Sequence, residues 1–144
     1  VTRLVDMGVE PFLVSSSLLA VLAQRLVRRL CKQCKVAGEI TDEEIRELGI
    51  DPSKVTSRQI FRPGNTQCPT CQGTGYTGRL GIHEILVIDD DVRAQILQRM
   101  DSNSIRTSAI KRGFSTLRMD GARKVFMGQT SVEEVILASH DDFA

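Results

Sequence analysis

The sequence is poor in aromatic residues. Only 4% of its 144 residues are aromatic, with five Phe, one Tyr and no Trp. Aromatic side chains bury more surface than any others, so a core in this chain must be built from Leu, Ile and Val. The composition, 41% hydrophobic and 26% charged, is otherwise ordinary for a globular protein. The length is enough for one domain or two small ones.

The chain also lacks an excess of charge of either sign. Its formal net charge is +1 at pH 7, which creates no long-range field that favours nucleic acid or an anionic membrane. Single-stranded nucleic acid also calls for aromatic side chains on which bases stack. We therefore expect no nucleic-acid partner. A gel shift at low salt tests this expectation.

Long hydrophobic runs are absent. The longest apolar stretch, residues 12–23, contains three serines and is followed directly by Gln24 and Arg25. It is therefore too short to span a bilayer, and polar and charged residues prevent its extension. The first residues show no basic region followed by an apolar one, and we expect no export signal. The chain opens without an initiator Met, in the middle of a pattern, and we interpret it as a fragment of a longer protein.

Catalytic motifs are missing as well. The sequence holds no GxxxxGK[ST] phosphate loop, no GxSxG nucleophile elbow and no HExxH. We interpret His83, in an apolar stretch, as a structural or surface residue, and His140, in an acidic tail, as solvated. The paired carboxylates all occur at predicted helix starts, where capping and the helix dipole explain them. We therefore assign no catalytic and no cofactor-binding residue to this segment.

The chain does contain two Cys-x2-Cys pairs, Cys31 with Cys34 and Cys68 with Cys71, separated by residues 35–67. Without an export signal, such pairs indicate a reducing compartment and a bound metal, not disulfides. Each pair can direct two thiolates at one ion from a tight turn, and two pairs complete the tetrahedral sulfur cage that Zn²⁺ accepts. Because four thiolates leave no open position, the sequence predicts a structural zinc site with all four as ligands.

The residues around the cysteines support this prediction. Gly73, Gly75 and Gly78 allow the backbone to fold closely around the sulfurs, and Lys32 and Lys35 can offset part of the thiolate charge. An iron–sulfur cluster, or cysteines that bind metal only in some states, are alternative interpretations. A thioredoxin-like redox pair fits less well, because one pair would suffice for it.

The stretch CPTCQGTG also resembles one unit of the zinc domain of DnaJ-type co-chaperones. That family carries four such units in succession. The first pair here, in CKQCKVAG, lacks the glycine pattern, so we discount this resemblance.

In the first part of the chain, leucines at three- and four-residue steps predict a helix over 15–30. Its arginines at 25, 28 and 29 are then explained by the helix dipole and by solubility. A second helix is expected at 41–48, opened by a Thr41–Glu44 capping box and ended by Gly49. An extended segment around 58–65 and an apolar strand over 80–88 follow.

The last 56 residues are expected to form four short helices arranged as a small bundle. The expected N-caps lie at Asp89–Asp91, at Ser102 or Ser104, at Ser115 or Thr116, and at Thr130 in a capping box with Glu133. Gly113 and Gly128 are the expected stops.

Several stretches taken together resemble one family. MGVEPFLVSSSLLAVLAQRLVRRLC, the two cysteine pairs, CQGTGYTGRLGIHEIL and DGARKVFMGQTSVEEV are similar, in this order, to the C-terminal third of the secretion ATPases. Members of that family are hexameric RecA-like motors for type II protein secretion and type IV pilus assembly. The stretch GRLGIHEILVIDDDVR, with His83, favours the type II secretion member. A type IV pilus assembly (extension) ATPase is the alternative within the family. A stand-alone zinc-ribbon interaction module is the alternative from another class, and a gel shift at low salt can separate it from the motor hypothesis.

The resemblance implies an α+β fold in three parts. Residues 1–30 would end a RecA-like ATPase core, 31–88 would form a tetracysteine metal-binding module, and 89–144 would form a C-terminal helical subdomain. We expect zinc to stand in for a core that a module of this size and composition can hardly supply. The residues that carry over from the family are Cys31, Cys34, Cys68 and Cys71, as the zinc site.

The resemblance also implies a parent enzyme that hydrolyses ATP with Mg²⁺ as a homo-hexamer. It would be cytoplasmic, peripheral at the bacterial inner membrane, and bound to inner-membrane components of the secretion machine. Its phosphate loop and Mg²⁺-linked carboxylates would lie upstream of Val1, so this segment is expected to be inactive alone.

Overall fold

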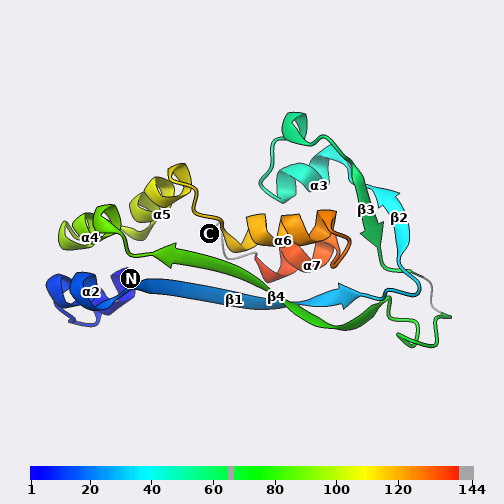
Figure 1. The fold of residues 1–144 in the computed structure, drawn as a ribbon, viewed down its shortest axis with the longest axis horizontal. Helices are drawn as coiled ribbons and strands as arrows, with labels where there is room; N and C mark the ends of the chain where they lie inside the picture. Colours follow the sequence, from blue (N-terminus) through cyan, green and yellow to red (C-terminus); the bar gives the residue numbers. More distant parts are fainter. Residues whose placement is uncertain (65–66, 140–144) are drawn as a thin grey trace. The chain divides into compact units, whose positions relative to one another are not determined.

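The computed structural model describes residues 1–64 and 67–139 and shows a mixed α+β fold (Figure 1). No helix in this described part of the chain combines the length and the apolar character needed to cross a membrane. The elements in chain order are α1 (Thr2–Asp6), α2 (Pro11–Ser17), β1 (Ala20–Leu30), β2 (Val36–Glu39), α3 (Asp42–Glu47), the 3-10 helix η1 (Pro52–Lys54), β3 (Gln59–Arg62), β4 (Tyr76–Val87), α4 (Asp90–Leu97), α5 (Ser102–Lys111), α6 (Leu117–Phe126) and α7 (Val132–Ala138).

The chain divides into two compact units. Unit 1 comprises residues 1–23 and 84–116, and unit 2 comprises residues 24–83 and 117–144. Strands β1 and β4 therefore contribute residues to both units. The units do not coincide with the three segments expected from the sequence. The assignment of those segments to a RecA-like core, a metal module and a helical subdomain stays a prediction.

Unit 1 is built on a small aliphatic core. Helices α2 and α4 lie side by side (Figure 1) and bury Val14, Val92 and Ile96. Ile88 and Ile105 complete the buried cluster. Several large apolar side chains in α2 or in the loops next to α1 and α2, such as Met7, Phe12 and Leu19, stay exposed. Unit 1 thus has a core, but one that leaves much of its apolar surface uncovered.

The helix predicted over 15–30 is wrong for most of its length. Helix α2 ends at Ser17, and the following residues form the 11-residue strand β1, which pairs with β4. Ala, Leu, Gln and Arg favour helices locally, but pairing with a distant strand overrides that preference. The arginines at 25, 28 and 29 consequently lie on a strand, and the helix-dipole explanation for them is wrong.

Hydrogen bonds at both ends of the β1–β4 pair fix its direction. The Ile88 N–H donates to the Leu19 carbonyl at one end, and the Cys31 N–H donates to the Gly75 carbonyl at the other, each at 2.9 Å. The strands are therefore antiparallel, and the apolar strand predicted over 80–88 is confirmed as part of β4. These bonds enclose one more residue in β4 than in β1. Gly78, with a φ of 69°, is where a bulge can absorb the extra residue.

The second sheet lies wholly in unit 2. Strands β2 and β3 run antiparallel, with Val36 opposite Arg62 and Glu39 opposite Gln59, which confirms the predicted extended segment. Helix α3 lies between the two strands in sequence. Its capping box is also confirmed, because the side chains of residues 41 and 44 each accept a hydrogen bond from the other's backbone N–H.

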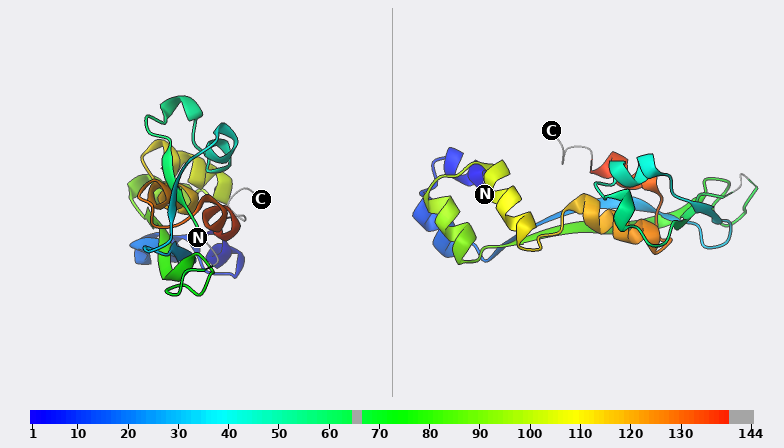
Figure 2. Two further views of the ribbon diagram at one scale, coloured as in Figure 1. Left: turned by 90° about the vertical axis from the view of Figure 1, so that its right-hand side faces the viewer. Right: turned by 90° about the horizontal axis from the view of Figure 1, so that it is seen from above.

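The core of unit 2 joins two distant parts of the sequence. Helices α6 and α7 pack against one another (Figure 2) and against the α3 region. This core means that the cysteine-bearing segment has aliphatic support in addition to any metal. Its fully buried members are Ile40, Ile45, Leu48, Ile60, Ala122, Val125, Val132 and Val135.

The N-caps of unit 1 were predicted with mixed success. Asp89 caps α4 as expected, its carboxylate accepting the Val92 N–H at 2.9 Å. Ser102 and Ser104 are not the cap of α5. Asp101 is, because its carboxylate accepts the Ser104 N–H at 3.0 Å.

In unit 2, the capping box predicted for α7 is wrong. The N-cap is Ser131, and the Thr130 hydroxyl instead donates to the Arg28 carbonyl at 2.8 Å. The hydroxyl that the local sequence predicted to cap the helix is therefore used in a tertiary contact with β1. Helix α6 begins directly after Thr116. The glycine stops after α3, α5 and α6 are confirmed by positive φ at Gly49, Gly113 and Gly128.

Arg118 is a buried cation that joins α6 to the ends of two other helices. Its guanidinium donates to the Glu47 carbonyl (2.9 Å), and to the carbonyl (2.8 Å) and hydroxyl (3.0 Å) of Ser139. These carbonyls lie at the C-terminal ends of α3 and α7, where the helix leaves acceptors unsatisfied and favours a cation.

We expect Arg118→Met to lower the free energy of unfolding by about 2–4 kcal/mol, because it leaves buried carbonyls without donors. Urea denaturation measures this change. The matched control is Arg123→Met on the same helix, since the Arg123 side chain is 63% exposed. The control should cost less than about 0.5 kcal/mol. Equal losses in the two variants would contradict the role given to Arg118.

Candidate metal centre

The first cysteine pair forms the turn between β1 and β2. Cys31 directly follows β1, and its N–H is held by the Gly75 carbonyl next to β4. The Lys35 N–H donates to the Cys31 carbonyl at 3.0 Å. This bond closes the turn and brings Cys34 back beside Cys31.

The second pair forms a similar turn between β3 and β4. The Gly73 N–H donates to the Cys68 carbonyl and the Thr74 N–H donates to the Cys71 carbonyl, each at 3.1 Å. Gly73 and Gly75 both have a φ of 78°, a left-handed conformation that glycine adopts without steric cost. The expectation that glycines let the backbone fold around the sulfurs is therefore confirmed at these two positions.

Two glycines allow the backbone to approach the site closely. A Cβ on Gly64 would collide with the backbone carbonyl group of Cys34, and a Cβ on Gly75 would lie 2.6 Å from the Pro63 Cβ. Sequence analysis missed the role of Gly64. A Pro–Gly dipeptide such as Pro63–Gly64 is typical of a turn, but nothing in the local sequence shows which part of the chain that turn contacts.

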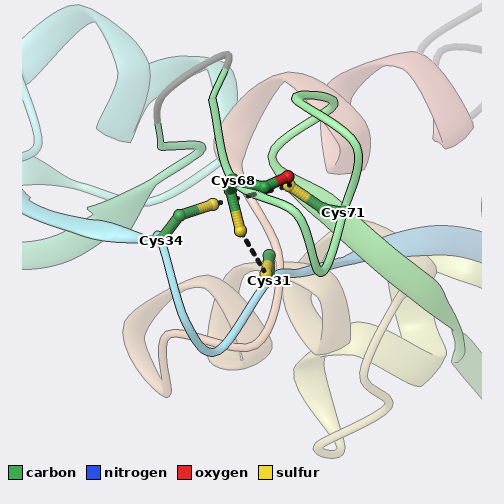
Figure 3. A group of neighbouring side chains, drawn as sticks. All are labelled: Cys31, Cys34, Cys68 and Cys71. Atoms are coloured by element: carbon green, nitrogen blue, oxygen red, sulfur yellow. Dashed lines mark hydrogen bonds between the residues drawn. The ribbon is translucent and has the colours of Figure 1, made fainter.

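The four sulfurs converge on one point, as Figure 3 shows. The Sγ atoms of Cys31 and Cys68 are 3.9 Å apart, and those of Cys34 and Cys71 are 3.6 Å apart. All four sulfurs lie within 4.8 Å of one another. Three of the cysteines are buried and Cys34 is partly exposed. The structure thus brings together all four residues that the sequence singled out.

This geometry fits a tetrahedral ion. A Zn–S bond of about 2.3 Å places the sulfurs of a tetrahedron about 3.8 Å apart, which agrees with the two sulfur–sulfur distances above. The four cysteines can therefore hold a metal ion. Four sulfur ligands fill a tetrahedral shell, so an ion here would have no position open for substrate or water.

The surroundings shift the pKa values of Cys71 and Cys34 in opposite directions. Burial opposes ionisation of Cys71, but the Gly75 N–H donates to its sulfur at 3.3 Å and, with the neighbouring thiols, lowers the pKa of Cys71 overall. Burial raises the pKa of Cys34, and its hydrogen bonds with the other thiols add to that rise. A cation among the sulfurs favours the thiolate form of both residues.

Side chains around the two turns connect the centre to the rest of unit 2. The Thr70 hydroxyl donates to the Gln33 side-chain oxygen at 2.6 Å, directly between the turns. The Lys35 ammonium group donates to the Gly128 carbonyl at 2.9 Å and lies 4.1 Å from the centre of the Phe61 ring. Lys35 therefore joins the first turn to the end of α6 and to β3.

The histidine predicted to be structural or at the surface has both characters. The His83 side chain is 41% exposed, with its Nδ1 3.9 Å from Asp120 Oδ2. Its backbone N–H donates to the same carboxylate oxygen at 2.9 Å. His140 lies outside the described residues.

One of the three arginines on β1 takes part in a defined ion pair. Arg28 contacts the Glu134 carboxylate at 2.7 Å, and its guanidinium lies 4.0 Å from the centre of the Tyr76 ring. Burial opposes ionisation of Glu134, but the hydrogen bonds from Arg28 hold the pKa of that carboxyl below its usual value. This pair joins β1, β4 and α7 in unit 2.

Comparison with known proteins gives the context of this centre. A family model described as type II/IV secretion system protein matches residues 1–137. The chain belongs to this family. It is 46% identical to the type II secretion system protein E of Aeromonas hydrophila over 99% of its length, and 43% identical to the type IV pilus assembly ATPase PilB of Thermus thermophilus over 94%.

A third relative in the secretion family is the type II secretion system protein HxcR of Pseudomonas aeruginosa, 44% identical over 98% of the chain. The chain spans only 27%, 15% and 26% of these three relatives, in the order named. The resemblance seen in the sequence is therefore confirmed at the level of the family. Relatives named for secretion and for pilus assembly match it alike.

Proposed function

We propose that this chain is the C-terminal part of the ATPase that powers type II protein secretion. One observation carries the proposal, the 46% identity to a type II secretion system protein E along 99% of the chain. The relatives named for type II secretion match 98–99% of the chain, whereas those named for pilus assembly match 94%.

The parent protein, in this proposal, is a homo-hexamer that hydrolyses ATP with Mg²⁺. It works in the cytoplasm, peripheral at the bacterial inner membrane, and contacts inner-membrane components of the secretion machine. The family resemblance supports these assignments. The 144 residues alone are not expected to hydrolyse ATP, because their sequence has no GxxxxGK[ST] phosphate loop.

The metal in this proposal is a structural Zn²⁺ ion held by Cys31, Cys34, Cys68 and Cys71. When bound, it supplies a cross-link and no catalysis, because the sulfurs occupy every tetrahedral position. The cross-link joins the β1–β2 turn to the β3–β4 turn. Through β2 and β3 it stiffens the part of unit 2 that shares a core with α6 and α7. A rigid module of this kind is suited to passing force between a motor and a partner.

A second candidate function is the assembly of type IV pili. It is favoured by the 43% identity to the pilus assembly ATPase PilB of Thermus thermophilus and the 42% identity to the pilus assembly ATPase TfpB of Acinetobacter baylyi.

Deleting the parent gene in its host tests the choice between these functions. We expect exported enzymes to accumulate inside the cells and to fall at least tenfold in the medium, while surface pili persist. Loss of pili with normal secretion would establish the second candidate. If neither changes, and the purified full-length protein does not hydrolyse ATP, the proposed function is wrong.

A further inference from the structure

The four cysteines differ in their access to solvent. The exposed fraction is 0% for Cys31, 6% for Cys71 and 9% for Cys68, whereas Cys34 is partly exposed. The susceptibility of a cysteine to oxidation depends on its exposure to the reagent. A small oxidant that enters from solvent therefore reaches the sulfur of Cys34 first.

The sulfur of Cys34 lies next to a sulfur of the other turn. Its Sγ is 3.6 Å from that of Cys71, and the two pairs joined by dashed lines in Figure 3 both connect the first turn with the second. A disulfide bond is about 2.05 Å long, so the sulfurs of Cys34 and Cys71 need to approach by about 1.5 Å. Rotation about the Cα–Cβ bonds of the two residues produces a shift of this size.

Contacts between protein groups hold this pair in place. Gln33 directly precedes Cys34, and its side-chain oxygen accepts a hydrogen bond at 2.6 Å from Thr70, which directly precedes Cys71. The Gly75 N–H donates to the Cys71 sulfur at 3.3 Å and fixes its position. The two sulfurs are therefore kept close by contacts that need no ion, and a bond between them forms at high effective concentration.

We propose that Cys34 and Cys71 are a site of reversible oxidation, at which hydrogen peroxide forms a disulfide between the two cysteine turns. The disulfide itself needs only the two thiols. The release of Zn²⁺ that accompanies it rests on the proposed function, in which the four cysteines hold that ion. Disulfides that form in a reducing compartment are usually transient and catalytic or redox-sensing.

The reaction has two steps. In the first, the Cys34 sulfur attacks one peroxide oxygen, so that an S–O bond forms, the O–O bond breaks and one water leaves with the thiol proton. In the second, the Cys71 sulfur attacks the Cys34 sulfur, the S–S bond forms, and the S–O bond breaks to release a second water. The two sulfurs together lose two electrons, which the peroxide gains.

The position of this disulfide preserves the connection between the turns. A bond between Cys34 and Cys71 joins the β1–β2 turn to the β3–β4 turn, as the proposed ion does, whereas a bond between Cys31 and Cys34 would lie within one turn. Cys31 and Cys68 would remain as two ligands, which do not fill a tetrahedral shell. Oxidation would therefore release the ion and leave the turns covalently joined.

Peptide mapping tests the proposal in the 144-residue chain and in the full-length parent. Each protein is freed of reductant, treated with increasing amounts of hydrogen peroxide, alkylated and digested with trypsin. Cleavage after Lys32 separates Cys31 from Cys34, so Cys34 lies in peptide 33–35 and Cys71 in peptide 59–79. We expect the first disulfide to join these two peptides, fragmentation to place it at Cys71, and dithiothreitol to remove it.

A first disulfide within either turn would overturn the proposal. So would oxidation of Cys34 to a sulfinic acid while Cys71 stays reduced. A chromogenic chelator follows the metal separately, and we expect one Zn²⁺ ion to be released for each Cys34–Cys71 disulfide. Formation of this disulfide in a protein that elemental analysis finds free of metal would support the oxidation site and contradict only the zinc ion of the proposed function.

Two serine variants identify the partner of Cys34 independently. In Cys71→Ser, the sulfenic acid of Cys34 has no partner, so its adduct with dimedone should be at least tenfold more abundant than in the wild type. Cys68→Ser is the matched control, because it removes a thiol from the same turn and also leaves three cysteines. It should form the Cys34–Cys71 disulfide and little adduct. Equal adducts in the two variants would show that Cys71 is not the partner.

Discussion

Removing the proposed Zn²⁺ ion is expected to cost unit 2 about 4 kcal/mol or more in its free energy of unfolding, the range reached when a structural metal is lost. Cys71→Ser should have this effect because it takes away one of the four proposed ligands and leaves three thiols, two of them buried, around an incomplete site. The two turns would then be held together by the Thr70–Gln33 and Cys31–Gly75 hydrogen bonds, by the β2–β3 pairing and by the shared aliphatic core. Because that core remains, we expect unit 2 to become less stable but to keep part of its helices.

Three measurements check this prediction. Elemental analysis should find one Zn²⁺ per wild-type chain and far less in Cys71→Ser. Denaturation should show the loss of stability, and a chelator should reproduce it in the wild type. In cells, the variant parent should be degraded faster and secrete less. Gln33→Ala is the control, since it alters the first cysteine turn and removes the Thr70 hydrogen bond without removing a cysteine. A metal-free Cys71→Ser protein that melts with the wild type would refute the cross-link.

Gly64→Ala is expected to damage the same centre without touching a sulfur. Its new Cβ would collide with the backbone carbonyl group of Cys34, which cannot rotate away as a side chain can. Either the Pro63–Gly64 turn or the first cysteine turn must move, and the sulfur of Cys34 moves with the latter. We expect a stability loss of about 3 kcal/mol, at the upper end of the usual overpacking range, and at least tenfold weaker metal binding.

A matched substitution at Gly78 separates the effect of this collision from the effect of backbone strain. Gly78 has a φ of 69°, but a Cβ there would meet no atom within 4 Å. Gly78→Ala should therefore cost only about 1 kcal/mol, the penalty of a left-handed conformation, and should leave metal affinity unchanged. Competition with a chromogenic zinc chelator measures the affinities. If the two alanine variants bind zinc equally well, the close approach at Gly64 is not what shapes the site.

The cysteine cluster could be predicted from the sequence because its pattern is local. Two cysteines three residues apart already lie on one turn, and the glycines after Cys71 predict a tightly folded backbone. The spacing does not reveal which other segments enclose the turns. Gly64 and Lys35 reach their contacts only because β3 and α6 lie next to the first turn, and this arrangement involves residues far apart in the chain.

The helix ends also divide into those set by nearby residues and those set by distant ones. The stop at Gly49 and the cap at Asp89 depend on residues a few positions away, and both predictions are confirmed. The capping box at Thr130 failed because the hydroxyl bonds to β1 instead. Local rules fail where a distant partner competes for the same atom.

By itself, the sequence determined the four cysteines that come together, the aliphatic character of the core and the family, because each of these depends on residue type and short spacing. Only the tertiary structure decided that residues 20–30 form a strand, that this strand pairs with β4, and that α6 and α7 share a core with the cysteine-bearing segment. The physical reason is that strand pairing and core packing join distant segments. Their free energy can override a local helix preference of well under 1 kcal/mol per residue.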